Sequence, residues 1–424
     1  MGKGTKKPKW TFMVYIAGDN NLDPAALKDI AEMAKVGSSE DLNIIVQLDR
    51  ARDRKTRRFY ITKGGGYQKD CVETFDETNT GDPAVLEDFI LWGMEKYPAS
   101  RYALVIWNHG GGWWDEPERA RRNIAYDDSS NGDSLNNQEL QDVLDKVAQI
   151  RGNKIDILGM DACLMAMVEV AYQLRDSVKI TVGSEEEEPF DGWPYDRVLD
   201  VLKNRPRVGT ATVGRNIVKE YIKSYQGKGE DVTQSAFNLY SIGDAVCKLD
   251  ALSQELVIGL KDKVVFDAVS YARDCSPKFF YDNYIDLYRF VQVLKDRCNQ
   301  EGIKDKAGDL LRALKPGSKQ AIIYQRRLGR RLKHTHGMSI YFPSSEINPK
   351  YRELDFYRDC KWGEFLEKYL NTKNRRSHDQ GEETEESDFT RAGHYGPGFA
   401  GNPWRNKAGQ FTNKDRDEDG KAYT

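Results

Sequence analysis

The sequence lacks any apolar run long enough to cross a membrane. None of its segments approaches the roughly 18 or more consecutive apolar residues that a membrane-spanning helix needs. The basic residues 1–9 are followed by a short apolar segment that contains Tyr15 and leads into Asp19, without the small-residue cleavage pattern of an export signal. We therefore interpret residues 10–17 as the first strand of the fold, and we expect no membrane partner.

Cysteine is scarce, and the cysteines are not closely paired. The 6 cysteines are scattered along the chain without a Cys-x-x-Cys pair, so the sequence indicates neither a disulfide framework nor a zinc site. Reduced thiols in a chain of this size are typical of the cytosol, so we expect a cytoplasmic setting.

The sequence also lacks a large excess of positive or negative charge. The 64 lysines and arginines are balanced by 67 aspartates and glutamates, which leaves a net charge of -3. A protein that binds nucleic acid mainly through phosphate contacts is usually basic, so no nucleic-acid partner is expected. With 39% hydrophobic residues, the chain has enough apolar material for a large core. Its 424 residues predict two or three folding units, at roughly 100–200 residues each.

Apolar segments of strand length alternate with helix-like segments in the first half of the chain. The strand-like segments are residues 10–17, 43–49, 102–107, 155–160 and 178–183. The helix-like segments are residues 24–36, 83–97, 137–150 and 164–175. This alternation predicts an α/β fold with a mostly parallel sheet that helices cover on both faces. The arginine-rich residues 57–62 predict a solvated hairpin at the sheet edge.

The second half is richer in helical patterns. Residues 1–9 are expected to be a flexible N-terminus, residues 10–195 the core of the fold, and residues 196–372 a helix-rich part that completes it. The last helix is predicted at residues 362–370. Residues 373–424 are polar and lack periodicity, which predicts a disordered tail.

Chemically active residues follow the predicted strands, where parallel sheets gather ligands and catalysts. His109 and Gly110 come after the third strand, Asp161 and Cys163 after the fourth, and Asp191 soon after the fifth. Each has an ordinary alternative, because a single cysteine is usually a small buried hydrophobe and a glycine run can serve only a loop with positive φ. Their coincidence on one edge of the sheet favours a catalytic site.

A cysteine beside a histidine suits nucleophilic catalysis. A neighbouring imidazolium lowers the pKa of a thiol from its usual value of about 8.5 and so provides a thiolate. Cys163 would attack a carbonyl, and His109 would protonate the leaving amine. Backbone N–H groups of Gly110 and Cys163 are candidates for the oxyanion hole, where each donor lowers the barrier by about 3–4 kcal/mol. A helix expected to begin after Cys163 would further favour the thiolate through its dipole.

Carboxylates near these two residues predict a pocket for a basic side chain. Asp161 lies two residues before Cys163 and should face the same cavity, because side chains alternate along an extended chain. A carboxylate there can pair with a guanidinium or an ammonium group. Asp191 would complete the anionic pocket. For the acidic residues 185–188, a solvated loop is favoured over a direct role in binding.

These segments resemble the clostripain family of cysteine peptidases, which shares a clan with caspases, gingipains, legumain and separase. The most specific pieces are Trp107-Asn-His-Gly-Gly-Gly-Trp113 and Met160-Asp-Ala-Cys-Leu164, and the resemblance runs from about residue 10 to residue 370. It implies a caspase-like three-layer α/β sandwich and a His109/Cys163 dyad. It also implies protein or peptide substrates that are cleaved after Arg or Lys, with Asp161 as the specificity acid supported by Asp191.

The resemblance further implies maturation by internal cleavage between the histidine and cysteine segments. Residues 119–123 read Arg-Ala-Arg-Arg-Asn, so we predict a cut between Arg122 and Asn123, the alternative being a merely soluble basic loop. The sequence requires no cofactor or metal. Some relatives depend on calcium, and the acidic residues can host it, but the sequence defines no ligand set. Family members are often secreted, so secretion stays open beside the cytoplasmic setting.

Two other functions stay open at this point. One is a non-catalytic caspase-like module that binds basic partners through its acidic edge, although the presence of both His109 and Cys163 counts against it. The other is nucleic-acid binding through a basic segment, residues 326–333, whose spacing equally suits an edge strand or a helix face.

Overall fold

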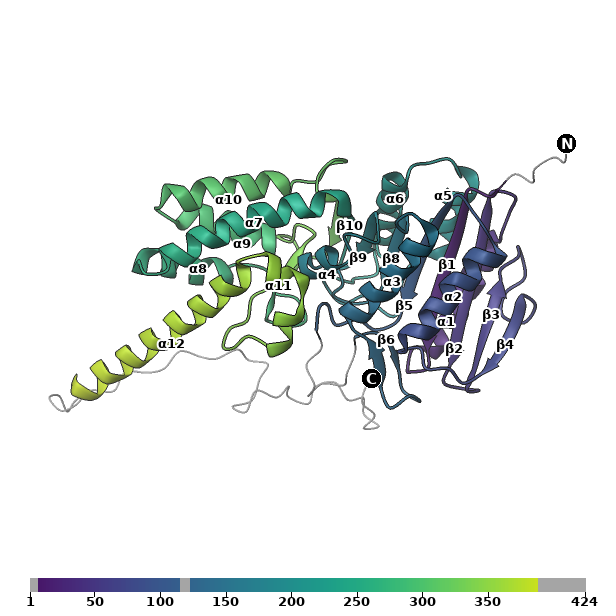
Figure 1. The fold of residues 1–424 in the computed structure, drawn as a ribbon, viewed down its shortest axis with the longest axis horizontal. Coiled ribbons are helices and arrows are strands. Elements are labelled where there is room, and N and C mark those ends of the chain that lie inside the picture. Colours follow the sequence, from purple (N-terminus) through teal and green to yellow (C-terminus); the bar gives the residue numbers. More distant parts are fainter. Residues whose placement is uncertain (1–6, 115–122, 388–424) are drawn as a thin grey trace. The chain divides into compact units, whose positions relative to one another are not determined.

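The computed structural model describes residues 7–114 and 123–387, with side chains as far as residue 376. The chain divides into two units, residues 1–372 and residues 373–424. The first unit is built on a nine-stranded sheet with the order β12-β10-β9-β8-β5-β1-β2-β3-β4. Figure 1 shows this sheet running from β4 at one end through β1 and β5 toward β10. The predicted α/β fold with a mostly parallel sheet is therefore confirmed.

The five strands predicted in the first half form the parallel centre of the sheet. They are β1 (Trp10–Gly18), β2 (Leu42–Arg50), β5 (Arg101–Trp107), β8 (Ile157–Asp161) and β9 (Ile180–Gly183). Their register places Val14 opposite both Val46 and Val105. Antiparallel strands extend both ends of the sheet, namely β3 (Lys55–Tyr60) and β4 (Cys71–Asp76) at one end and β10 (Val232–Asn238) and β12 (Ile322–Leu328) at the other.

Both faces of the central strands are buried, which explains why their sequences are apolar throughout. Along β1, Phe12 and Val14 enter one hydrophobic core while Met13 and Tyr15 enter the other, as alternation along a strand requires. The first core also contains residues of α1 (Asp23–Val36), α5 (Tyr195–Asn204) and α6 (Thr210–Ser224). The second also contains residues of α2 (Pro83–Lys96), α3 (Asn137–Arg151) and α4 (Val168–Gln173).

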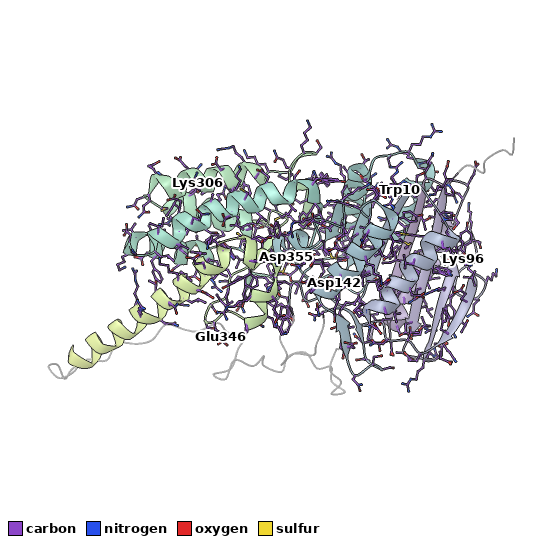
Figure 2. All side chains as sticks on the ribbon, in the orientation of Figure 1. Trp10, Lys96, Asp142, Lys306, Glu346 and Asp355 are labelled. Atoms are coloured by element: carbon purple, nitrogen blue, oxygen red, sulfur yellow. The ribbon has the colours of Figure 1, made fainter. Side chains whose placement is uncertain are left out.

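The helices begin where the sequence carries capping residues. Asp82 accepts a hydrogen bond from the backbone N–H of Ala84 at the start of α2. Asn136 and Glu139 form a complete capping box at the start of α3. Figure 2 shows the side chains on these elements, including the buried Trp10 at the start of β1 and the exposed Asp142 on α3.

The later part of the first unit is mainly helical and shares the second core. Its helices are α7 (Leu239–Gly259), α8 (Lys263–Asp274), α9 (Leu287–Arg297), α10 (Glu301–Ala313), η1 (Pro349–Glu353), α11 (Asp355–Asp359) and α12 (Trp362–Ser387). Two small sheets pair β6 (Ile124–Asp127) with β7 (Asp133–Leu135) and β11 (Tyr284–Asp286) with β13 (Ser339–Tyr341). Because β10 and β12 also come from this part of the chain, it completes the central sheet.

Two helices, α4 and α12, differ from their predicted bounds by several residues. The helix α4 begins at Val168 instead of residue 164, because Leu164 has a positive φ of 66° that interrupts helical geometry. Cys163 therefore does not lie at a helix N-terminus. The expectation that a helix dipole favours its thiolate is wrong. The helix α12 extends to Ser387, so the first residues of the predicted disordered tail are helical. Residues 388–424 lie outside the described residues.

Among the described residues, none of the helices combines the length and the apolar character that a membrane crossing requires.

Candidate active site

A cavity of about 230 Å³ lies at the carboxyl ends of β5 and β8. His109 and Cys163 both line it, as does Asp161. The other residues that line this cavity are Asn21, Leu22, Trp107, Asn108, Ala162, Glu187, Glu188, Pro189, Phe190 and Gly192. The structure thus brings the predicted histidine, cysteine and first carboxylate to one cavity, as expected for residues that follow adjacent parallel strands.

Gly110 allows the histidine loop to approach the cysteine loop closely. A methyl group added at Gly110 would lie 2.4 Å from the carbonyl oxygen and 3.1 Å from the backbone nitrogen of Cys163. Any larger residue would therefore push the two loops apart. Glycine is needed at position 110 because the two loops approach each other closely there. The positive φ of 77° in this glycine run occurs at Gly112. The backbone nitrogens proposed for the oxyanion hole belong to these two neighbouring loops.

The loop after β1 positions the ring of His109. The Nε2 atom of His109 lies 2.8 Å from Oδ1 of Asn21. The side chain of Asn20 donates to the carbonyl oxygens of Ala17 and Tyr126, at 2.9 and 3.1 Å, and holds this loop in place. Asn21 was not given a role by the sequence analysis. Its position beyond the carboxyl end of β1, the neighbour of β5, is the signal that could have identified it.

Cys163 is covered by the acidic loop that follows β9. The backbone N–H of Glu188 donates to the Sγ atom of Cys163 at 3.3 Å. The pKa of the Cys163 thiol is raised to about 12, mainly by burial; the hydrogen bond from Glu188 lowers it, and the negative charges of Glu188, Glu187 and Glu186 raise it. The expectation of a lowered pKa is therefore wrong for this arrangement, in which the sulfur is a neutral thiol.

Asp161 is buried beside a second carboxyl group, that of Glu188. The hydroxyl of Tyr195 donates to Oδ2 of Asp161 at 2.8 Å, and the backbone N–H of Trp193 donates to it at 3.3 Å. Burial raises the pKa of Asp161 to about 6 despite these bonds. Burial, followed by the charge of Asp161, raises the pKa of Glu188 well above its usual range. The two carboxyl groups thus share one region of low dielectric.

Glu188 belongs to an acidic run that is largely buried. Glu185 and Glu186 are only 1% and 3% exposed. The backbone N–H of Gly337 donates to Glu185 at 3.0 Å, and Arg331 forms an ion pair with Glu186 at 2.5 Å. The interpretation of residues 185–188 as a solvated loop is wrong except at the exposed Glu187. Four identical glutamates in a row show no alternation of polar and apolar residues. The sequence therefore does not indicate which of these side chains are buried and which are exposed.

Glu188 also contacts Gln234 on β10. The side-chain amide of Gln234 donates to Oε1 of Glu188 at 3.0 Å. The carboxyl groups of Glu188 and Asp161 also hydrogen-bond to each other. Glu188 lines the cavity. Glu188 is thus a candidate binding residue that the sequence analysis did not single out.

The structure separates Asp191 from the cavity. Its carboxylate forms ion pairs with Lys28 and Lys228, each at 2.6 Å, and its side chain is 44% exposed. Hydrogen bonds from these two lysines lower its pKa. Its neighbours Phe190 and Gly192 line the cavity, but Asp191 itself does not. The predicted support of Asp161 by Asp191 is therefore not present, because Asp191 is neutralised at the surface.

Two further predictions concern Arg122 and the basic segment, residues 326–333. Arg122 lies outside the described residues, which resume at Asn123, so the predicted cut stays a prediction. Arg326 and Arg327 lie on β12, a strand at the edge of the sheet. This position agrees with the edge strand that was the alternative to a nucleic-acid site.

Comparison with known proteins agrees with the resemblance in the motifs. The model of the clostripain family matches residues 14–369. Clostripain from Hathewaya histolytica is 35% identical over 231 residues, which cover 47% of this chain and 43% of that protein. This chain thus matches less than half the length of that relative.

Solved structures share the fold. A secreted C11 cysteine protease from Bacteroides thetaiotaomicron, in complex with an irreversible peptide inhibitor, superposes with a TM-score of 0.65 at 22% identity, covering 84% of this chain and 99% of that chain. An inactive zymogen C11 protease from Parabacteroides distasonis gives a TM-score of 0.63 at 20% identity, covering 84% of this chain and 99% of that chain. The cytoplasmic setting expected from the cysteines stays a prediction, and the first of these two relatives is a secreted protein.

Proposed function

Since the chain belongs to the clostripain family, we propose that it is a cysteine endopeptidase in which Cys163 is the nucleophile and His109 the general acid and base. One observation carries this proposal: both side chains line the same cavity at the carboxyl ends of adjacent parallel strands. A substrate carbonyl in this cavity would lie within reach of both residues.

The chemistry follows from the two side chains. The imidazole of His109 takes the thiol proton as Sγ of Cys163 attacks the substrate carbonyl, and it then gives this proton to the leaving amine. A thioester remains, and water activated by the same imidazole hydrolyses it. Backbone N–H groups of Gly110 and Cys163 are the candidates to hold the oxyanion, each lowering the barrier by about 3–4 kcal/mol. Asn21 keeps the imidazole oriented during these steps.

We infer that the preferred substrates carry Arg or Lys before the scissile bond. Asp161 and Glu188 place two carboxyl groups at the cavity, and burial, as the largest cause, raises the pKa of both. A guanidinium or ammonium group beside them would offset this effect and allow both groups to ionise. The carboxylate oxygens of Asp161 and Glu188 would be the acceptors for such a group.

A series of matched peptides tests this function. Fluorogenic peptides that differ only at the residue before the scissile bond are incubated with the protein, with and without calcium. Cleavage is expected after Arg and Lys and to be on the order of 100-fold or more slower after Leu, because an apolar side chain leaves the carboxyl groups unpaired. Binding of basic peptides without turnover would instead favour the non-catalytic module.

We infer that the described arrangement, in which the thiol is covered, precedes activation. For Cys163 to ionise, its burial must be relieved and the charges of residues 186–188 must move away from the sulfur, since burial first and these charges after it raise its pKa. Internal cleavage after Arg122 is the trigger that we propose. The related protein from Parabacteroides distasonis is an inactive zymogen, which supports an inactive form for this chain as well.

Mass spectrometry tests the cleavage site. Prolonged incubation of the wild-type protein is expected to yield a fragment that begins at Asn123, whereas Arg122→Gln should remove this fragment. Arg121→Gln is the matched control, because it removes the same charge from the adjacent position and should leave the cut in place. A wild-type chain that stays intact throughout would contradict self-processing.

A further inference from the structure

A second group of acidic residues lies apart from the residues that line the cavity. Asp19 follows β1, Asp49 lies in β2, Glu77 follows β4 and Asp127 ends β6. Each offers a carboxylate oxygen, and these atoms all lie within 4.8 Å of one another. Four segments that are distant in the sequence therefore converge on one point.

The oxygens in this acidic cluster are buried and incompletely bonded. Asp49 is 0% exposed and Asp19 is 2% exposed, yet Oδ2 of each has no hydrogen-bond partner. Both carboxylate oxygens of Glu77 also lack a hydrogen-bond partner. A buried carboxylate oxygen without a partner is strongly unfavourable unless a cation or a proton neutralises it.

Within residues 7–114 and 123–387, little positive charge lies at this point. Arg54 approaches Glu77 with 3.7 Å between Nε and Oε2, but the arginine side chain is 69% exposed. Such an exposed ion pair contributes little. The Arg54 pair is therefore a weak counterweight to four carboxylates that converge on one point.

Neighbouring groups fix the carboxylates in place. Asp127 accepts hydrogen bonds from the backbone N–H groups of Thr80 and Ser130, each at 2.9 Å. The hydroxyl of Thr56 donates to Oδ1 of Asp49 at 2.8 Å, which leaves Oδ2 for the cluster. The ligand atoms are therefore held ready, as a preformed cation site requires.

We propose that Asp19, Asp49, Glu77 and Asp127 together bind one calcium ion. Calcium takes six to eight oxygen ligands at roughly 2.3–2.6 Å, so opposite ligands lie about 5 Å apart, which suits the spacing in this cluster. Magnesium usually binds through one or two carboxylates and keeps several waters. Zinc favours histidine and cysteine ligands, which the cluster lacks.

The bound ion connects this cluster to the catalytic histidine. Asp19 stands two residues before Asn21, whose side chain contacts His109. The backbone N–H of Asp128 donates to the carbonyl oxygen of Asp19 at 2.8 Å, so the residue after Asp127 is joined to the same loop. By tying Asp19 to three other segments, calcium stabilises the loop that orients the imidazole.

Calcium binding is measured directly, without reference to peptidase activity. The full chain carrying Cys163→Ala, which prevents self-cleavage, is freed of metal with a chelator and titrated with calcium chloride in a calorimeter. One site is expected, and calcium should raise Tm. Asp49→Asn should weaken binding on the order of 100-fold, because it removes the charge of a central ligand and halves its acceptor oxygens.

Asp76→Asn is the matched control for the loss of one negative charge. Asp76 precedes Glu77, but its side chain is 95% exposed and pairs with Lys55, so this variant should bind calcium as the wild type does. If Asp49→Asn does not fold, Glu77→Gln provides the second test, because Glu77 is only partly buried. Three outcomes would overturn the proposal. The unsubstituted cluster does not bind calcium, or Asp49→Asn and Asp76→Asn bind calcium equally well, or the cluster binds magnesium more tightly than calcium. None of these outcomes bears on whether Cys163 is the nucleophile.

Discussion

Cys163→Ala is expected to lower kcat for a peptide with Arg before the scissile bond by at least about 10⁴-fold. The substitution removes the sulfur that forms the covalent intermediate, and no other group in the cavity is a comparable nucleophile among the residues that line it. It deletes a single atom from a half-buried side chain, so the fold should persist. Initial rates with a fluorogenic peptide measure the effect, and circular dichroism with a Tm checks folding.

The matched control is another cysteine. Cys247→Ala makes the same change at an exposed position on α7 and should leave kcat unchanged. If Cys163→Ala retains activity within tenfold of the wild type, a different residue is the nucleophile. The double variant with His109→Ala should be no slower than Cys163→Ala alone, because residues that act as one unit have non-additive effects.

Asp161→Asn is expected to lower kcat/KM for the same peptide by about 10²–10³-fold, which corresponds to about 3–4 kcal/mol for a buried ion pair that has lost one partner. The asparagine side chain has nearly the same size and can still accept the hydrogen bond from Tyr195, so the cavity keeps its shape. Peptides with Leu at this position should be little affected. The measurement is the ratio of kcat/KM for the Arg and Leu peptides.

Asp191→Asn is the control for this second prediction. Asp191 lies two residues from the cavity-lining Pro189, but Lys28 and Lys228 neutralise its charge. Its removal should change the Arg/Leu ratio less than about threefold, since exposed ion pairs contribute little. If Asp191→Asn alters selectivity as strongly as Asp161→Asn does, the assignment of Asp161 as the specificity residue is wrong.

The central sheet and the heart of the site could be predicted from local sequence because their signals are local. Each parallel strand is a nearly continuous apolar segment, and the carboxyl-end rule then brought His109, Asp161 and Cys163 together without any knowledge of distant contacts. The start of α4 was misjudged, because a positive φ at a leucine such as Leu164 is uncommon and carries no sequence signal.

Features that depend on distant segments could not be predicted. Whether Asp191 serves the cavity is decided by Lys28 and Lys228, which come from α1 and from the loop after α6. The burial of Glu188 depends on Gln234 in β10, and the acidic cluster forms only when four separate segments meet. Tertiary contacts of this kind fix side-chain environments that no local pattern encodes.

The anchoring of the acidic loop by late segments has a consequence during translation. Glu185 and Glu186 receive their partners Gly337 and Arg331 from residues synthesised long after Cys163. At ~5–20 residues per second, a ribosome needs on the order of ten seconds or more to span that interval. Until then the nascent chain lacks these two anchors of the loop beside Cys163, so we expect an unfinished polypeptide to have no completed pocket with which to damage its neighbours.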